Sequence, residues 1–155
     1  VSSFGKDCPS MDREESYGPV VAMLKGVAPA AASAGVTLAL ENPLSPADNR
    51  KLVDLVAHPA VKVYYDPYNM EYHGHRGQSI PGFELLGASR VAQVHVKNGK
   101  QLLSEPGPVD WSVALQALRR IRYSGWLVFE TAHSSAEQCV EATTKNIEFL
   151  RRLMV

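Results

Sequence analysis

The sequence has no long hydrophobic run, no block of like charge and almost no cysteine. Its longest apolar segments are the length of a β-strand, which excludes a transmembrane helix of about 20 residues. Acidic and basic side chains balance at 16 each, and this balance argues against broad electrostatic binding to nucleic acid or to an anionic membrane. Because no signal peptide is visible either, we expect a cytoplasmic protein.

Cys8 and Cys139 lie far apart and lack the spacing of a metal site, so they are expected to be reduced thiols. The 155 residues suffice for one domain, and we expect a single, partial domain over residues 1–155. The chain begins at Val1 rather than methionine, so we expect a processed or excised piece, or a chain that has lost its start.

Apolar segments of strand length recur along the chain. They are GVTLALEN (35–42), VKVYYDPYN (61–69), VAQVHVKN (91–98) and GWLVFET (125–131). The first, second and fourth show little polar alternation, which is typical of parallel strands buried on both faces.

Helical segments are predicted before, between and after these strands, at 12–34, 45–60, 80–89, 108–125 and 134–154. The first should be interrupted or kinked near Gly26 and Pro29. Ser45 and Asp110 are predicted N-caps. In the segment that follows Asp110, the predicted core face consists of Val113, Leu115, Leu118 and Ile121.

Strict alternation of strand and helix predicts an α/β fold with a parallel sheet and right-handed crossovers. Two architectures compete, an open doubly wound sheet and a length of (β/α) barrel. An open nucleotide-binding sheet favours a glycine-rich first turn, but neither GxGxxG nor GxxxxGK[ST] follows any predicted strand.

Each predicted strand carries a potential metal ligand at or near its end: Glu41, Asp66, His95 and Glu130. A lone aspartate after a strand is usually a turn residue, and a lone histidine in an apolar strand is usually a core residue. Two glutamates at the ends of such apolar strands, however, would be poorly solvated without a partner. Since strand ends of a barrel converge on one face, we interpret these residues as one shared site.

The segments LALEN, YYDPYN, VHVKN and GPVDWSVALQALRRIRYSGWLVFET resemble the last four strands and loops of the xylose isomerase-like TIM-barrel superfamily, in its sugar phosphate isomerase/epimerase group. The resemblance implies the C-terminal half of a TIM barrel, strands 5–8. It also implies one divalent ion, Mn, Mg, Co or Zn, bound by Glu41, Asp66, His95 and Glu130. Glu41 and Glu130 would then be the catalytic acid and base.

The implied activity is a metal-dependent isomerase or epimerase that moves a proton next to the carbonyl of a sugar or sugar phosphate. Asn69 is an implied substrate contact, and Lys97 either faces the substrate or is a solvated loop lysine. The sequence does not choose among epimerase, isomerase and dehydratase. The superfamily's DNA repair nucleases need further histidine ligands that this chain lacks. The alternative is a catalytically silent half-barrel or binding module that retains ancestral ligands.

Four βα units are too few for a barrel of about 250 residues. The half-barrel could close by pairing with a second copy, could be a fragment of a larger barrel, or could flatten. Exposed sheet edges favour self-association, and a homodimer is our hypothesis.

Overall fold

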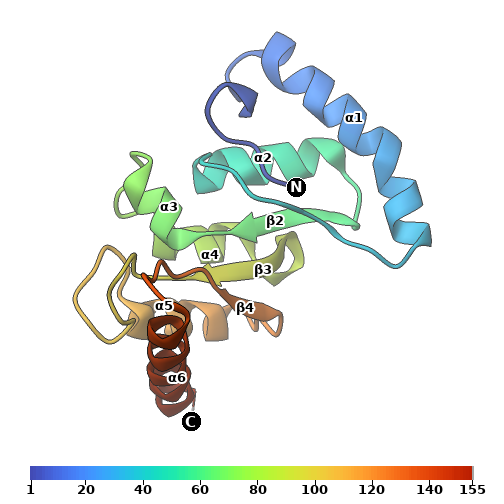
Figure 1. Ribbon diagram of the computed structural model, residues 1–155. Coiled ribbons are helices and arrows are strands. Elements are labelled where there is room, and N and C mark those ends of the chain that lie inside the picture. Colours follow the sequence, from blue (N-terminus) through green and yellow to red (C-terminus); the bar gives the residue numbers. More distant parts are fainter. Residues whose placement is uncertain (155) are drawn as a thin grey trace.

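The structure is a computed structural model and describes residues 1–154. Its strands form one parallel sheet, in which each strand pairs with the next along the chain (Figure 1). The strands are β1 (Leu38–Leu40), β2 (Val61–Tyr65), β3 (Val91–Val96) and β4 (Trp126–Phe129). The predicted α/β fold with parallel strands is therefore confirmed.

Helices occupy the segments before, between and after the strands. They are α1 (Glu14–Ser33), α2 (Pro46–Val56), α3 (Pro67–Tyr72), α4 (Ser79–Leu86), α5 (Trp111–Arg120) and α6 (Ala136–Leu153), with short 3-10 turns at Gly5–Asp7 and Ala88–Arg90. The predicted caps are confirmed, because Ser45 accepts the Asp48 N–H and Asp110 accepts two N–H groups of α5. The sequence analysis missed α3. None of the helices within residues 1–154 combines the length and apolar character needed to cross a membrane.

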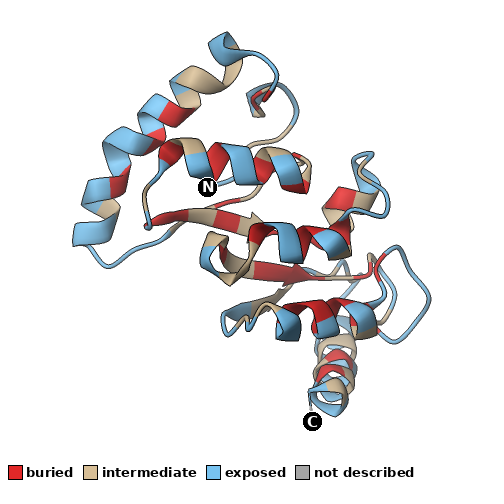
Figure 2. Cartoon of the chain, turned by 180° about the vertical axis from the view of Figure 1, so that it is seen from behind, coloured by how far each residue is buried: buried red, intermediate tan, exposed pale blue. Residues whose placement is uncertain are grey.

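Alternating side chains in β2 divide the sheet into two faces. Val61, Val63 and Tyr65 are buried, whereas Lys62 and Tyr64 are half-buried. Helices α4 and α5 lie on one side of the sheet, behind it in Figure 1 and in front of it in Figure 2, where the buried residues gather between sheet and helices. The core of the protein is this layer.

The opposite face of the sheet is more exposed than predicted. Trp126 of β4 is 77% exposed, and no residue of β4 is fully buried. The expectation that this strand is buried on both faces is therefore wrong. The apolar residues of β4 predicted burial of both faces, but among the described residues the face that carries Trp126 is left uncovered.

Helix α1 is continuous, contrary to the interruption predicted near Gly26 and Pro29. Its buried residues, Val21, Leu24 and Ala28, form one stripe, while Gly26 and Pro29 lie on the exposed side. Water can therefore satisfy the backbone groups that a proline leaves unpaired.

The predicted core face of α5 is partly wrong. Leu115 and Leu118 are buried as expected, but Val113 is 39% exposed. Trp111 and the neighbouring alanines of α5 fill the core instead. The indole of Trp111 also donates a hydrogen bond of 3.0 Å to the Lys97 carbonyl, which ties α5 to the loop after β3.

Candidate metal centre

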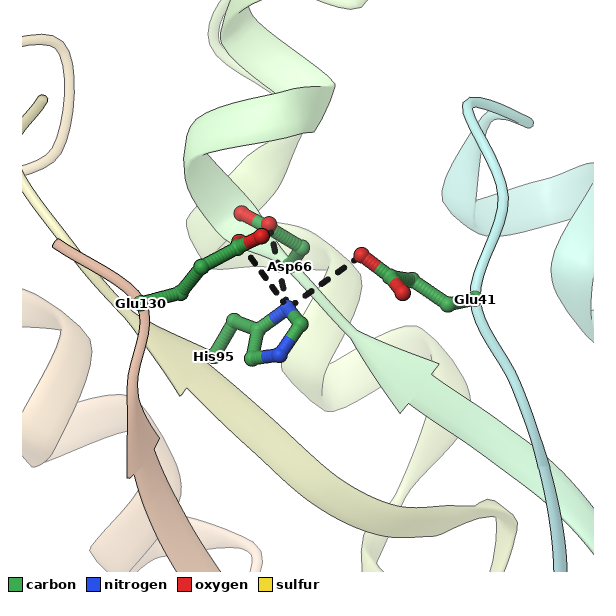
Figure 3. Close-up of side chains that lie close together, drawn as sticks. All are labelled: Glu41, Asp66, His95 and Glu130. Atoms are coloured by element: carbon green, nitrogen blue, oxygen red, sulfur yellow. Dashed lines mark ion pairs between the residues drawn. The ribbon is translucent and has the colours of Figure 1, made fainter. Parts of the chain in front are cut away.

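The four predicted ligands meet at one edge of the sheet (Figure 3). Glu41, Asp66 and Glu130 each directly follow a strand, and His95 is the penultimate residue of β3. One ligand atom from each of these residues lies within 4.8 Å of all the others. The parallel register explains this convergence, because Tyr65 pairs with Val94 and Val96 pairs with Phe129, which brings the strand ends side by side.

His95 Nδ1 lies at the centre of the group. It is 3.3 Å from Glu41 Oε1, 3.4 Å from Asp66 Oδ2 and 3.3 Å from Glu130 Oε2. The nitrogen is buried and, within residues 1–154, has no hydrogen-bond partner. The imidazole is held by contact with the ring of Tyr64, whose centroid lies 3.9 Å away. Three carboxylate oxygens therefore surround one nitrogen without forming well-aligned hydrogen bonds to it.

Asp66 has a separate role for each of its carboxylate oxygens. Oδ1 caps α3 by accepting the Asn69 N–H at 2.9 Å, while Oδ2 faces His95. The side chain is only 1% exposed, and this burial opposes ionisation. The nearby His95 ring, the Lys97 ammonium and the Asn69 N–H together outweigh burial and hold the pKa of Asp66 below its ordinary value. Asp66 is therefore a charged residue inside the fold.

Lys97 belongs to the same cluster. Its Nζ lies 2.7 Å from Asp66 Oδ2 and 2.6 Å from Glu130 Oε2, and its side chain is 12% exposed. Burial works against the ammonium, but the two carboxylates raise the pKa of Lys97 above its ordinary value. The ammonium also lies 5.5 Å from the ring centroid of Tyr68. Lys97 is thus not a solvated loop lysine, which was one of its two predicted states.

A surface cavity of about 410 Å³ adjoins the cluster. Its lining consists of Tyr68, Lys97, Gly99, Glu130, Thr131 and Ala132. Asn69 lies in the first turn of α3, next to the Asp66 cap. Sequence analysis missed Tyr64 and Tyr68, although Tyr64 precedes Asp66 by two residues and so shares its face of the strand.

The other histidines near this edge do not join the cluster. His75 Nε2 lies 3.0 Å from the Pro43 carbonyl, which fastens the loop after α3 to the loop after β1. His73 packs against Phe4 with a centroid distance of 6.0 Å. Both rings are therefore engaged by residues outside the cluster.

The residues of the cluster fit a divalent ion. Carboxylate oxygens and an imidazole nitrogen suit Mn, Mg, Co or Zn to different degrees. Asp66 Oδ2 and His95 Nδ1 are buried without a well-aligned hydrogen bond from any of the described residues, and such groups normally have a partner. A shared cation at the convergence point would satisfy both.

The parallel α/β sheet with metal-type ligands at its strand ends agrees with the comparison to known protein families. Residues 3–153 match the model of the xylose isomerase-like TIM barrel family, and the chain belongs to that family. No curated protein sequence matches the chain.

Solved structures of similar fold include two sugar epimerases and a xylose isomerase domain protein. The D-allulose 3-epimerase from Methylomonas sp. is 20% identical, with a TM-score of 0.72 over 94% of this chain and 58% of that chain. The 3-keto-D-glucoside 4-epimerase from E. coli is 19% identical, with a TM-score of 0.68 over 94% of this chain and 55% of that one. A xylose isomerase domain protein from Alicyclobacillus acidocaldarius subsp. acidocaldarius is 21% identical, with a TM-score of 0.70 over 99% and 63%. The chain therefore spans less than two thirds of the length of these proteins.

Proposed function

We propose that this protein is, or is the metal-binding half of, a divalent-metal-dependent isomerase or epimerase that acts on a sugar or sugar phosphate. The observation that carries the proposal is the convergence of Glu41, Asp66, His95 and Glu130 on one point at the ends of neighbouring strands. The similar structures include epimerases of D-allulose and of a 3-keto-D-glucoside, which supports a sugar substrate.

Glu41, Asp66, His95 and Glu130 would hold the ion. When bound, such an ion supplies a positive charge that stabilises negative charge on substrate oxygens. Glu41 and Glu130 approach His95 from opposite sides in Figure 3, and we assign them the proton transfers. One carboxylate takes the proton from the carbon beside the carbonyl, and the C–H electron pair becomes part of an enediolate. The other glutamate, in its protonated carboxylic acid form, delivers its proton to that intermediate and becomes a carboxylate.

The outcome depends on which atom receives the returning proton. Return to the same carbon from the opposite face inverts its configuration, which is epimerisation. Return to the neighbouring carbon exchanges aldose and ketose, which is isomerisation. The cavity beside Glu130 and Lys97 is the proposed place for the substrate, with Asn69 and Lys97 as contacts to its oxygens.

We further propose that the sheet is the half-barrel formed by strands 5–8, and that a second copy of the chain covers its open face. The exposed Trp126 on β4 supports this proposal, because a large apolar side chain on a sheet edge favours association. Analytical ultracentrifugation tests it. A stable monomer at micromolar concentration contradicts the homodimer and favours a chain that needs a different partner.

The experiment for the proposed function combines metal content with turnover. The purified protein should bind Mn²⁺ or Co²⁺ in calorimetry and gain thermal stability from either ion. Glu130→Gln should abolish epimerisation or isomerisation of a panel of ketoses while circular dichroism stays unchanged. Glu148→Gln, an exposed change on α6, is the matched control and should keep full activity.

Two outcomes contradict the proposal in different ways. If no divalent ion binds or shifts the melting temperature, the chain is a silent half-barrel or binding module. If the ion binds and Glu130→Gln keeps full activity, the metal centre stands but the assignment of Glu130 as acid or base is wrong.

A further inference from the structure

Lys97 contacts the same carboxylate oxygens that face the centre of the cluster. Its Nζ is 2.7 Å from Asp66 Oδ2 and 2.6 Å from Glu130 Oε2. These two oxygens also face His95 Nδ1, at 3.4 Å and 3.3 Å, as does Glu41 Oε1 at 3.3 Å. Two of the three carboxylate oxygens that face the centre are therefore already in contact with an ammonium group, and Glu41 Oε1 is the third.

The charges of the cluster explain why an ammonium is needed there. Three carboxylates surround one imidazole, and like charges at such short range repel one another. Within residues 1–154, no lysine or arginine other than Lys97 lies within ion-pair distance of Glu41, Asp66 or Glu130. Lys97 therefore neutralises part of a negative charge that the fold brings together.

The position of Lys97 is also asymmetric. Its ammonium pairs with Asp66 and Glu130 but makes no ion pair with Glu41 on the other side of His95. Lys97 also lines the surface cavity, together with Tyr68, Gly99 and Glu130. An ammonium pushed away from the two carboxylates thus has a neighbouring open space to enter.

We propose that Lys97 is a resident counter-cation of the centre, which a divalent ion must displace from Asp66 and Glu130. The inference rests on the metal centre of the proposed function. A divalent ion and an ammonium sharing the same oxygens would lie close enough to repel each other strongly. Entry of the ion therefore drives the Lys97 ammonium towards the cavity, where it can bind oxygens of a substrate. Metal binding precedes substrate binding in this scheme.

Metal affinity is the direct test. Removing the Lys97 charge should raise the affinity if Lys97 competes with the ion, and should lower it if Lys97 only holds the carboxylates in place. Lys97→Met keeps the aliphatic stem and removes the charge. In calorimetry with Mn²⁺, in a buffer alkaline enough to keep the carboxylates ionised, Lys97→Met should bind roughly tenfold more tightly than the unmodified protein. Lys145→Met is the matched control, because Lys145 also pairs with a glutamate at 2.6 Å but lies on the surface of α6. Its affinity should not change.

Thermal stability gives a second readout that does not depend on activity. Without metal, Lys97→Met should melt at a lower temperature than the unmodified protein, because the carboxylates then lack their counter-cation. With saturating Mn²⁺ this deficit should shrink, since the ion replaces the missing charge. Lys97→Arg keeps the charge and should bind Mn²⁺ with nearly the original affinity.

The outcomes separate this inference from the proposed function. If the unmodified protein binds Mn²⁺ and Lys97→Met binds it equally or more weakly, Lys97 only holds Glu130 in place and the inference is wrong. It is also overturned if Lys97→Arg binds as tightly as Lys97→Met. If neither the unmodified protein nor Lys97→Met binds the ion, the metal centre itself is wrong.

Discussion

Replacement of Asp66 tests whether one side chain serves both the fold and the centre. Its two oxygens accept the Asn69 N–H and face Lys97, respectively. Asp66→Asn leaves a single amide oxygen, which can serve only one of these donors, and removes the negative charge. Loss of the 2.7 Å charged contact between Lys97 and Asp66 should cost about 1.5–3 kcal/mol of stability, the range for interactions with charged groups.

Asp66→Ala removes both oxygens. It adds the loss of the α3 N-cap, typically about 1 kcal/mol, to the loss of the lysine contact. We therefore expect Asp66→Ala to be the less stable variant by about the value of the cap. Because a domain of this size has about 5–15 kcal/mol of stability, both variants should still fold.

Urea denaturation followed by circular dichroism measures these differences. Both variants should also lose the thermal shift that Mn²⁺ gives the unmodified protein. Equal stability of the two variants would show that the Asp66 cap contributes nothing. A cost below about 0.5 kcal/mol for both, which is the range of ordinary surface substitutions, would refute the buried ion pair.

Two further predictions concern the fold around the centre. A Cβ at Gly82 would overlap the Tyr65 hydroxyl and approach Pro46 Cγ to 2.7 Å, so Gly82→Ala should lower the free energy of unfolding by about 1–3 kcal/mol in urea denaturation. Gly26→Ala, which has open space at its Cβ, is the control and should raise that free energy by up to about 1 kcal/mol. An unchanged stability of Gly82→Ala would contradict the packing. Hydrogen bonds from Ser112 lower the pKa of Asp110, so its cap contributes stability above the ordinary carboxyl pKa of about 3.9 and loses it as the pH falls through the lowered value. Asp110→Asn should therefore flatten the acid side of the stability–pH curve, and an unchanged acid slope contradicts the assignment.

The positions of the candidate ligands could be predicted from the sequence because parallel strands end at one edge of a sheet. That rule needs only the strand boundaries, and the observed pairing of Leu40 with Val63, of Tyr65 with Val94 and of Val96 with Phe129 is consistent with it. Side-chain alternation then directs every second residue to the same face. Neither step requires knowledge of side-chain conformations.

Helix α3 was missed although its signals are the ones that correctly predicted α2. Ser45-Pro46 and Asp66-Pro67 both place a capping residue before a proline at the first helical position. At Asp66 the sequence pattern favours a strand-end ligand over a turn residue. A carboxylate has two oxygens, however, and the structure uses one for the cap and directs the other to the cluster.

The contacts of Lys97 could not be predicted in the same way. The sequence places Lys97 two residues after His95, which indicates its face of the strand but not its partners. Its contact with Glu130 depends on the register between β3 and β4 and on the conformation of a long side chain. Likewise, the apolar residues of β4 predicted burial, but Trp126 has no cover among the described residues.

The order of the strands allows metal binding and turnover to be separated. All four candidate ligands come from βα units that follow one another in the chain, and each ligand-bearing strand pairs with the next. The cluster therefore forms without any strand from outside residues 1–154. A substrate, by contrast, needs walls on all sides to exclude water and hold its reacting carbon near Glu41 or Glu130. The open face beside Trp126 provides no such wall. Loss of the proposed covering partner should accordingly abolish turnover while leaving the affinity for the ion intact, and substitution of a ligand should abolish both.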